Sequence, residues 1–497
     1  MKKLLLLIFV LCLQHVSSAG NPDDGKLWRV DWHSSARMAG STGEYMPFWA
    51  RTGEDGILPV RSSGLIAAGV DLSYRNPNGI YVEAGTNLAG AVSPKSPLND
   101  RQVYGLVDRL YMSAGWKMLH LDVGMKPREW EINDLSVSGG NFSYSRNARN
   151  LPGINAWSDW IYFEKGHWFG IKGNFAHYEM NDNRYVRETM VHNKELAVKV
   201  ALGKNVDLIC GLGHWVQWGG FSPSYGECPD SFSDYIKVIF AGRGGEDASL
   251  SDQLNMLGNH LGREYLRVDW RADAFTMTFQ YDTPFEDGSG MRLQNVPDGI
   301  WTLNFAFNER KAFVTDVIYE FVTTTWQSGT YHDRPATEEE MSKQDPDSFY
   351  YGKYVLGGCD NYFNHGEYRS GWTFHGRVLG CPLLLPNAPS EDGICRGMAS
   401  TRVRAHHFGM KGLAFDKVPY AFKATYSRNY GKYSQTDSSP FVAKPWQLSL
   451  ALEAEVARSM TGLPVSFSIG VYGDVGKLYQ NSAGLSLKVA YGGSRRF

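Results

Sequence analysis

A short aromatic segment at residues 214–220, "HWVQWGG", has residue types suited to binding a sugar. The indoles of Trp215 and Trp218 offer flat apolar faces, and His214 and Gln217 could supply hydrogen bonds at the rim of such a site. The tryptophans could equally belong to an aromatic girdle at a membrane interface. Both interpretations stay open for Trp218, whereas for His214 we favour the lumen of a barrel.

A second segment, "DNYFNHGEYRSGW" at residues 360–372, is denser in hydrogen-bonding and aromatic groups. It suits either a glycan site or a loop that folds inward and closes a lumen. Its candidate binding residues are Asn361, Tyr362, His365, Glu367, Arg369 and Trp372. The segment contains no twelve-residue calcium loop, so we expect neither a metal nor another cofactor.

Two adjacent carboxylates, Glu286 and Asp287, resemble the acid pair of a glycosidase. Neighbouring residues of a strand point to opposite faces, however, and these two precede Gly288, Ser289 and Gly290, which favours a tight turn. The chain also has no G-x-S-x-G elbow and no H-E-x-x-H helix. The sequence therefore predicts no catalytic residues, and we keep Glu286, Asp287 and the nearby Arg292 as carbohydrate-binding candidates.

Two arginines in "SYSRNARNLPG" (143–153) are further candidates. The guanidinium groups of Arg146 and Arg149 match the carboxylates of acidic sugars. The alternative is a lumen ion pair with acids such as Asp282 or Glu367. The sequence leaves both open.

Strands with one apolar face must position these segments. The end of the chain shows the pattern, because Leu485, Leu487, Val489 and Tyr491 alternate with polar or small residues. We expect about eighteen such strands. Their ranges are 43–52, 65–75, 79–88, 103–114, 117–126, 155–164, 166–177, 193–202, 206–216, 264–271, 274–282, 301–308, 312–326, 400–410, 417–428, 446–457, 464–473 and 483–497.

The connections between these strands alternate between short and long, which a soluble sandwich has no reason to do and which is typical of outer-membrane barrels. Beyond Leu13 the chain has no apolar run of about 18 residues, so it has no transmembrane helix. We therefore predict an all-β transmembrane antiparallel barrel with both termini in the periplasm. Its long loops lie outside the cell and partly close the lumen.

Both chain ends agree with this location. Lys2, Lys3 and the apolar run from Leu4 to Leu13 predict an export signal cleaved after Ala19. We expect residues 20–42 to form a periplasmic segment and residues 43–497 the barrel. The last strand must pair with the first, because an open sheet edge in lipid leaves backbone groups unsatisfied. The final Phe497 resembles the aromatic end that the barrel-assembly machinery recognises.

The composition excludes other partners. With 50 basic and 52 acidic residues and no basic block, the chain is not expected to bind nucleic acid. Five cysteines remain after cleavage, and we expect Cys359, Cys381 and Cys395 to lie close together. One oxidised pair and idle thiols are both open for them.

The loop segments resemble those of the Wzi capsule-assembly family, in its Bacteroides-type branch. The likeness rests on "SYSRNARNLPG", "HWVQWGG", "GNHLG", "PFEDGSGMRLQNVPDG" and "DNYFNHGEYRSGW" in this order, with "GSTGEYMPFWA" near the start. It implies an eighteen-stranded outer-membrane lectin, without catalytic activity, that helps to hold capsular polysaccharide at the cell surface. Enterobacterial members carry a periplasmic helical plug, whereas residues 20–64 here show no helical period.

The expected protein is thus a monomer in outer-membrane lipid that binds capsular or exopolysaccharide. Two alternatives remain: a passive porin, which conductance would reveal, and an outer-membrane hydrolase, which needs a nucleophile beside a base in the lumen. Long aromatic loops argue against an open pore.

Overall fold

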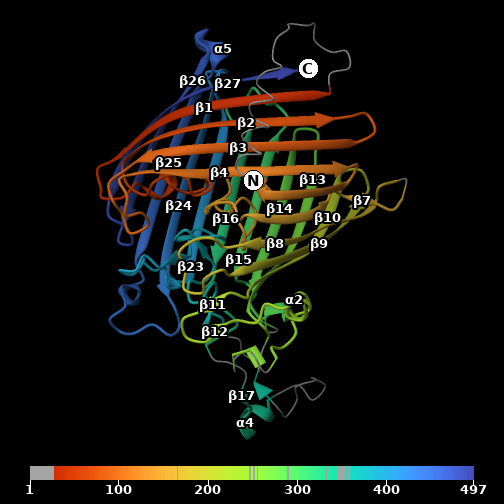
Figure 1. The fold of residues 1–497 in the computed structure, drawn as a ribbon, viewed down its shortest axis with the longest axis vertical. Helices are drawn as coiled ribbons and strands as arrows, with labels where there is room; N and C mark the ends of the chain where they lie inside the picture. The colour runs from red at the N-terminus through yellow and green to blue at the C-terminus, as the bar shows by residue number, and fades with distance from the viewer. Residues whose placement is uncertain are drawn as a thin grey trace.

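The chain forms one closed antiparallel β-barrel of 18 strands (Figure 1). The computed structural model describes residues 27–497 except 165, 246–247, 250–251, 254–255, 288–289, 331–333, 344–353 and 356–358. The expected signal peptide therefore lies outside the described residues. The number of strands and their antiparallel order confirm the predicted fold class.

The barrel strands follow one another in chain order. They are β1 (Trp28–Ser41), β2 (Ser63–Arg75), β3 (Ile80–Val92), β4 (Val103–Trp116), β5 (Leu119–Met125), β6 (Gly153–Ser158) with β7 (Ile161–Tyr162), β8 (Phe169–Glu179), β9 (Met190–Leu202), β10 (Val206–Trp218), β13 (Asn259–Arg271), β14 (Phe275–Phe285), β15 (Gly299–Phe307), β16 (Asp316–Thr323), β23 (Arg402–Ala414), β24 (Val418–Gly431), β25 (Trp446–Val456), β26 (Val465–Gly476) and β27 (Ser482–Arg496). Both β6 and β7 pair with β8, so together they make one strand.

The remaining elements are short and lie in the connections. They are η1 (Phe48–Ala50), β11 (Phe221–Ser222), β12 (Gly226–Glu227), α2 (Phe232–Ile239), η2 (Gly290–Arg292), β17 (Arg334–Pro335), α4 (Glu338–Met341), β18 (Tyr354–Val355), β19 (Thr373–Phe374), β20 (Arg377–Val378), β21 (Leu385–Pro386), β22 (Met398–Ser400), η3 (Pro440–Ala443) and α5 (Arg458–Thr461). No helix among the described residues is both long and apolar enough to cross a membrane. The long connections gather at one end of the barrel, at the bottom of Figure 1, with α2 and α4.

The barrel closes between its first and last strands. β1 pairs with β27 from Arg29 opposite Arg496 to Ser41 opposite Gly484. Two further bonds join the backbones of Trp28 and Phe497, with N···O distances of 3.2 and 3.0 Å. The well-patterned end of the chain is thus the last part of the seam.

The predicted first strand at 43–52 is wrong. Those residues form a connection containing η1, and β1 lies earlier, within the segment expected to be periplasmic. Its outward face begins with Trp28, Val30 and Trp32 but continues with Ser34 and Ala36, so the apolar period is too weak to recognise. Each of the other predicted strands overlaps an observed one.

Burial is inverted relative to a soluble protein. Leu485, Leu487 and Val489 are exposed on the outside of β27, whereas Arg263 and Glu320 are fully buried inside the barrel. Apolar residues on the outer face and polar residues on the inner face are what a bilayer requires. The outer faces of the strands therefore form the lipid-facing band.

The lumen is filled by inward-folded connections. The 126–152 connection descends along the inner wall, where the Ser136 hydroxyl donates to Glu320 (2.6 Å) and the Asn133 amide donates to Asn304 (2.8 Å). A buried apolar core surrounds it. Its members come from the 42–62, 126–152 and 324–401 connections, from eight barrel strands, and from Met180 in the connection after β8. We call this core, together with the inward-folded connections that carry it, the plug. In the described part of the chain it consists of loop segments and short elements.

The cysteines expected to lie together are free thiols in this structure. Cys381 and Cys395 are buried and Cys359 is half-buried, and Cys210 and Cys228 are also free. The idle-thiol alternative therefore describes all five.

A cation on the outer face of β27 tests the inverted pattern. Leu487→Arg puts a charge near the middle of the lipid-facing band and should destabilise the folded barrel by about 2–4 kcal/mol. Urea titration in lipid vesicles measures the change, with Leu487→Ala as the size control. Equal stability of the two variants would contradict a lipid-facing Leu487.

Candidate binding site

The plug brings together two tryptophans, Trp215 and Trp372, that the sequence predicts as carbohydrate-binding candidates. Trp372 is 1% exposed and Trp215 3%, and their rings meet edge to face at 5.7 Å. The Trp372 indole N–H donates to the carbonyl of Ser143 (2.5 Å), and Tyr144 lies against Trp215 at 4.3 Å. Protein atoms cover these rings, so in this conformation they hold the connections together and offer no open face to a ligand.

The other aromatic candidates of 214–220 lie outside the lumen. Because side chains alternate along β10, Trp218 and His214 are on the face opposite Trp215. Trp218 stacks on Tyr235 of α2 at 5.1 Å, and His214 Nε2 shares a hydrogen bond with His260 Nδ1 (2.9 Å). The expectation that His214 faces the lumen is wrong. The apolar alternation is weak at the end of β10, so the sequence did not show which way the His214 side chain points.

The acidic candidates fix the entry of the 324–401 connection into the lumen. Glu286 Oε1 accepts the backbone N–H of Phe363 (2.6 Å), and Asp287 accepts that of Gly290 (3.3 Å). Asp298 accepts the N–H of Gln327 (2.7 Å). Glu286 and Asp287 therefore hold backbone N–H groups, and the Glu286 carboxyl is desolvated by burial, whereas a tight turn would favour a solvated or arginine-paired carboxylate.

Burial changes the titration of these carboxyl groups. It raises the pKa of Asp360 to about 7 and that of Asp298 to about 6. The pKa of Glu286 is also well above its usual value, because of burial and the nearby Asp360 carboxylate. Desolvation disfavours the charged form of an acid, so burial shifts each of these groups towards its protonated form.

The two candidate arginines differ. Arg146 forms an ion pair with Asp55 (Nε···Oδ1 2.9 Å), which fits the ion-pair alternative with a different acid from those named. Among the described residues no carboxylate lies within ion-pair distance of Arg149. The nearby Arg377 donates only to the carbonyls of Arg51 (2.7 Å) and Leu58 (2.5 Å). Burial and the charges of Arg51 and Arg149 lower the pKa of Arg377 to about 9, so this region carries excess positive charge.

The remaining candidates divide by exposure. Arg292 and Arg369 are exposed on the outer connections, and Arg369 lies over the Tyr185 ring at 4.9 Å. Glu367 is buried and accepts from the Cys228 thiol (3.2 Å). Tyr362 is fully buried, and Asn361 and His365 are half-buried. An external ligand can therefore reach the two arginines directly.

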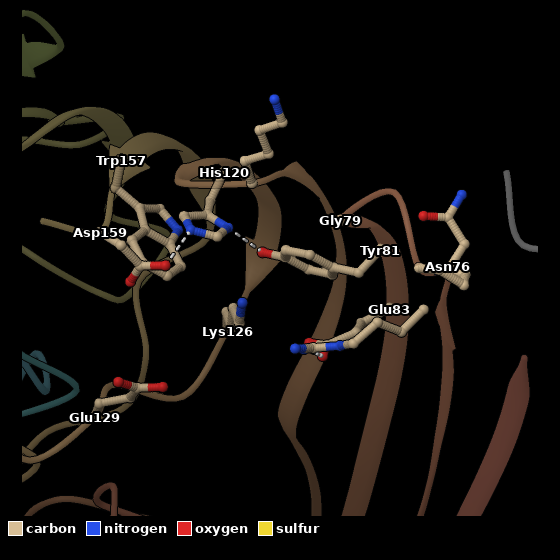
Figure 2. Close-up of a pocket in the computed structure, with 12 residues that line it drawn as sticks. Asn76, Gly79, Tyr81, Glu83, His120, Lys126, Glu129, Trp157 and Asp159 are labelled. Atoms are coloured by element: carbon tan, nitrogen blue, oxygen red, sulfur yellow. Dashed lines mark hydrogen bonds and ion pairs between the residues drawn. The ribbon is translucent and has the colours of Figure 1, made fainter. Parts of the chain in front are cut away.

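Sequence reasoning missed a pocket at the opposite end of the lumen. A cavity of about 340 Å³ lies beside the short turns at 76–79 and 117–118, which join strand ends on the side predicted to face the periplasm. Figure 2 shows its wall, built from inward side chains of β3, β5 and β6 and from the residues that follow β5 and β6. Its principal lining residues are Tyr81, Glu83, His120, Lys126, Glu129, Trp157 and Asp159.

A chain of contacts organises this pocket. His120 shares hydrogen bonds with the Tyr81 hydroxyl (2.8 Å) and with Asp159 (3.0 Å), and its ring stacks on Trp157 at 3.9 Å. Trp157 in turn donates to Asp122 (2.7 Å). Ordered rings beside carboxylates and amines can hold a polar ring-shaped ligand such as a sugar. In the sequence, only the polar face of His120 and Asp122 pointed to this site. The lining residues are spread over positions 81–159, which is too wide a spacing to suggest one site.

The described residues contain no group of three or more His, Cys, Asp or Glu side chains placed to hold a metal ion.

The fold and its lipid-facing band define the class of protein: an outer-membrane β-barrel. No known protein-family profile matches the chain, and no curated protein matches its sequence. Among solved structures it resembles Wzi of Escherichia coli, an outer-membrane protein involved in group 1 capsule assembly and a carbohydrate-binding barrel. The identity is 13%, the match covers 93% of this chain and 84% of Wzi, and the TM-score is 0.54.

Porin-like channels also match, at lower similarity. OccAB4 of Acinetobacter baumannii is 11% identical, with 96% of this chain and 100% of that chain covered and a TM-score of 0.45. OprD of Pseudomonas aeruginosa is 9% identical, with 96% and 99% covered and a TM-score of 0.44. At these identities the likeness to Wzi shows the fold alone, and the channel matches carry no further argument.

The raised pKa values predict that the plug loosens at high pH. The unfolded-state pKa of an Asp is about 4, so the stabilisation by protonated Asp360 and Asp298 is complete below about pH 4. It is lost as the pH rises through about 6 to 7. Hydrogen exchange of the 359–372 peptide, corrected for intrinsic rate, should be faster at pH 8 than at pH 5.

Substitution separates this effect from a general one. Asp360→Asn should reduce the pH dependence, with Asp298 and Glu286 still titrating. Asp392→Asn should retain all of it, because Asp392 is exposed and paired with Arg396 (2.5 Å). Identical pH dependence in both variants would show that Asp360 does not control the plug.

Truncation of a buried ring tests the packing role of Trp372. Trp372→Ala should reduce the local stability of the plug by roughly 3–5 kcal/mol, because it leaves a cavity in the core. Protease cleavage of the 324–401 connection in whole cells gives the readout. The exposed Arg369→Ala should be cleaved like the wild type, and equal protection of both variants would argue against a core role for Trp372.

Proposed function

We propose that this chain is a non-enzymatic outer-membrane barrel that binds capsular or exopolysaccharide and helps to assemble or anchor it at the cell surface. The observation that carries the proposal is the plug, whose buried core fills the lumen towards the cell exterior. The fold shared with Wzi, itself a carbohydrate-binding barrel, and the resemblance of the loop segments point to the same ligand class.

The plug favours binding over passive conduction. A porin needs a continuous water-filled path, but here apolar side chains of three connections pack against one another and against the wall. On the β2, β3 and β4 side, a second apolar cluster seats Leu58 against Leu65 and Leu106. Packed cores leave few voids larger than a water molecule, so the upper lumen offers ions no wide path.

The geometry also favours binding over hydrolysis. Glu286 and Asp298 accept backbone N–H groups of the plug, so their oxygens are engaged in holding structure. Such carboxylates serve as positioning groups, whereas a glycosidase needs two carboxyl groups facing one bond.

Two regions can contact the polysaccharide. The exposed cations Arg292 and Arg369 suit acidic sugars on the outer side. The pocket around His120 and Trp157 suits a sugar residue on the periplasmic side. The same proposal includes the other partners of the chain. The protein is a monomer in outer-membrane lipid, and the barrel-assembly machinery recognises its terminal Phe497.

Capsule retention tests the proposal. Deletion of the gene should shift polysaccharide from the cell-attached to the shed fraction, because the barrel would no longer bind it at the surface. Wild-type complementation should reverse the shift. Complementation with the double variant Arg292→Ala/Arg369→Ala and with Trp157→Ala then shows whether retention depends on the outer cations or on the periplasmic pocket.

Each variant needs a folding control, and the wild type needs a measurement that tests the porin alternative. Heat-modifiable gel mobility verifies that each variant forms a barrel. Unchanged retention after deletion would overturn the proposal. A stable open channel of the purified wild type in planar bilayers, together with that result, would make the protein a porin.

A further inference from the structure

Helix α2 packs on the outside of the barrel. It belongs to the long connection between β10 and β13, at the end of the molecule shown at the bottom of Figure 1. Its Tyr235 stacks on Trp218 at 5.1 Å, and the Tyr235 hydroxyl shares a hydrogen bond with His192 Nδ1 (3.2 Å). Val238 joins Val216 and Trp218 in a separate apolar cluster.

These contacts lie on the face opposite the lumen. The neighbours of Trp218 and His192 in their strands, Gln217 and Asn193, point inward: Gln217 donates to the plug carbonyl of Gly371 (3.2 Å), and Asn193 accepts from Asn174 across the inner wall. Because side chains alternate along a strand, Trp218 and His192 point outward. The connection has therefore folded back over the rim of the barrel.

The helix is well fixed at both ends. Ser231 and Asp234 form a capping box at its start, and Lys237 pairs with Asp234 (2.8 Å). At its end the Lys194 amine, from the outer face of β9, donates to the carbonyl of Ile239. A cation at a helix C-terminus is favourable, so α2 is a stable platform.

The face of α2 turned away from the barrel is apolar and bare. Phe232 is 79% exposed, Ile236 41% and Phe240 77%. Their spacing of four residues places them in one stripe along the helix. We call these three residues the α2 stripe. A helix that is apolar on its inner and outer faces is expected in contact with a second apolar medium.

The α2 stripe continues the lipid-facing band. The Lys194 amine lies 5.9 Å from the centre of the Phe240 ring, and Leu196, two residues along the same face of β9, is exposed in the band. Phe175 on β8 and Leu212 on β10 are exposed on either side of it. The Phe240 end of the α2 stripe therefore lies beside the lipid-facing band, with Lys194 between them.

We propose that α2 is an interfacial helix that inserts Phe232, Ile236 and Phe240 into the outer leaflet of the membrane, between acyl chains at the level of the headgroups. Such helices lie in the membrane plane with their apolar face buried about 5–10 Å into the boundary. Lys194 then sits where a lysine reaches the polar headgroups. The partner is a lipid, and the inference depends on the barrel fold and not on the polysaccharide proposal.

Photo-crosslinking in the intact outer membrane tests the lipid contact. Benzoylphenylalanine replaces Phe232 or Phe240 in the full chain, in cells whose fatty acids carry a radioactive label. Leu196 serves as the lipid-facing control, and the exposed Tyr225 between β11 and β12 is the matched aromatic control. Heat-modifiable mobility verifies folding before irradiation.

The labelled lipid should attach at 232 and 240 within about threefold of the yield at 196 and roughly tenfold above that at 225, as expected for side chains at the acyl boundary. Yields at 232 and 240 equal to that at 225 would overturn the proposal. A dominant adduct between two copies of the chain at 240 would also overturn it, because the stripe would then be a subunit interface.

Discussion

Every feature of this molecule depends on one constraint: backbone N–H and C=O groups inside a bilayer must find partners within the protein. A strand edge left open in lipid would expose a row of such groups, so β1 and β27 must meet. They do so along nearly their whole length, down to the reciprocal bonds between Trp28 and Phe497. Once the sheet is closed, its outer face must be apolar. All polar chemistry is then confined to the lumen and the connections.

The plug follows from this confinement. An enclosed lumen with polar walls would fill with water unless the connections entered it, and here three of them do so with an apolar core of their own. Their backbone is held by carboxylates and amides of the wall, as where Glu320 accepts the N–H of Val137 (2.7 Å). Buried polar groups that are fully hydrogen-bonded specify one arrangement of the chain. The same residues that gave the loops their sugar-binding appearance in the sequence, above all Trp215 and Trp372, supply this packing.

Period-2 alternation predicted all but the first strand, because the apolar face of each strand is visible in its own sequence. The alternation of short and long connections then distinguished a membrane barrel from a soluble sandwich. The first strand was not predicted because Ser34 and Ala36 interrupt its apolar face. Its position follows from barrel closure, because a strand must pair with the last one. The candidate site was harder to predict. An indole on a loop has the same sequence signature whether it binds a sugar, packs in a core as Trp372 does, or supports a helix outside the barrel as Trp218 does. The pocket around His120 was hidden because its residues come from separate strands.

The two ends of the lumen are unlike: the plug fills the outer part, and the Tyr81–His120–Asp159 pocket lies beside the periplasmic turns. The lumen is therefore closed at one end by the plug and open at the other. On the predicted topology, a solute in the pocket would exchange with the periplasm and not with the surrounding medium, so its occupancy would follow the cell's own export and not the contents of the environment. The two proposed ligand-contacting regions would then sample separate compartments, and the concentration of ligand in one would carry no information about the other.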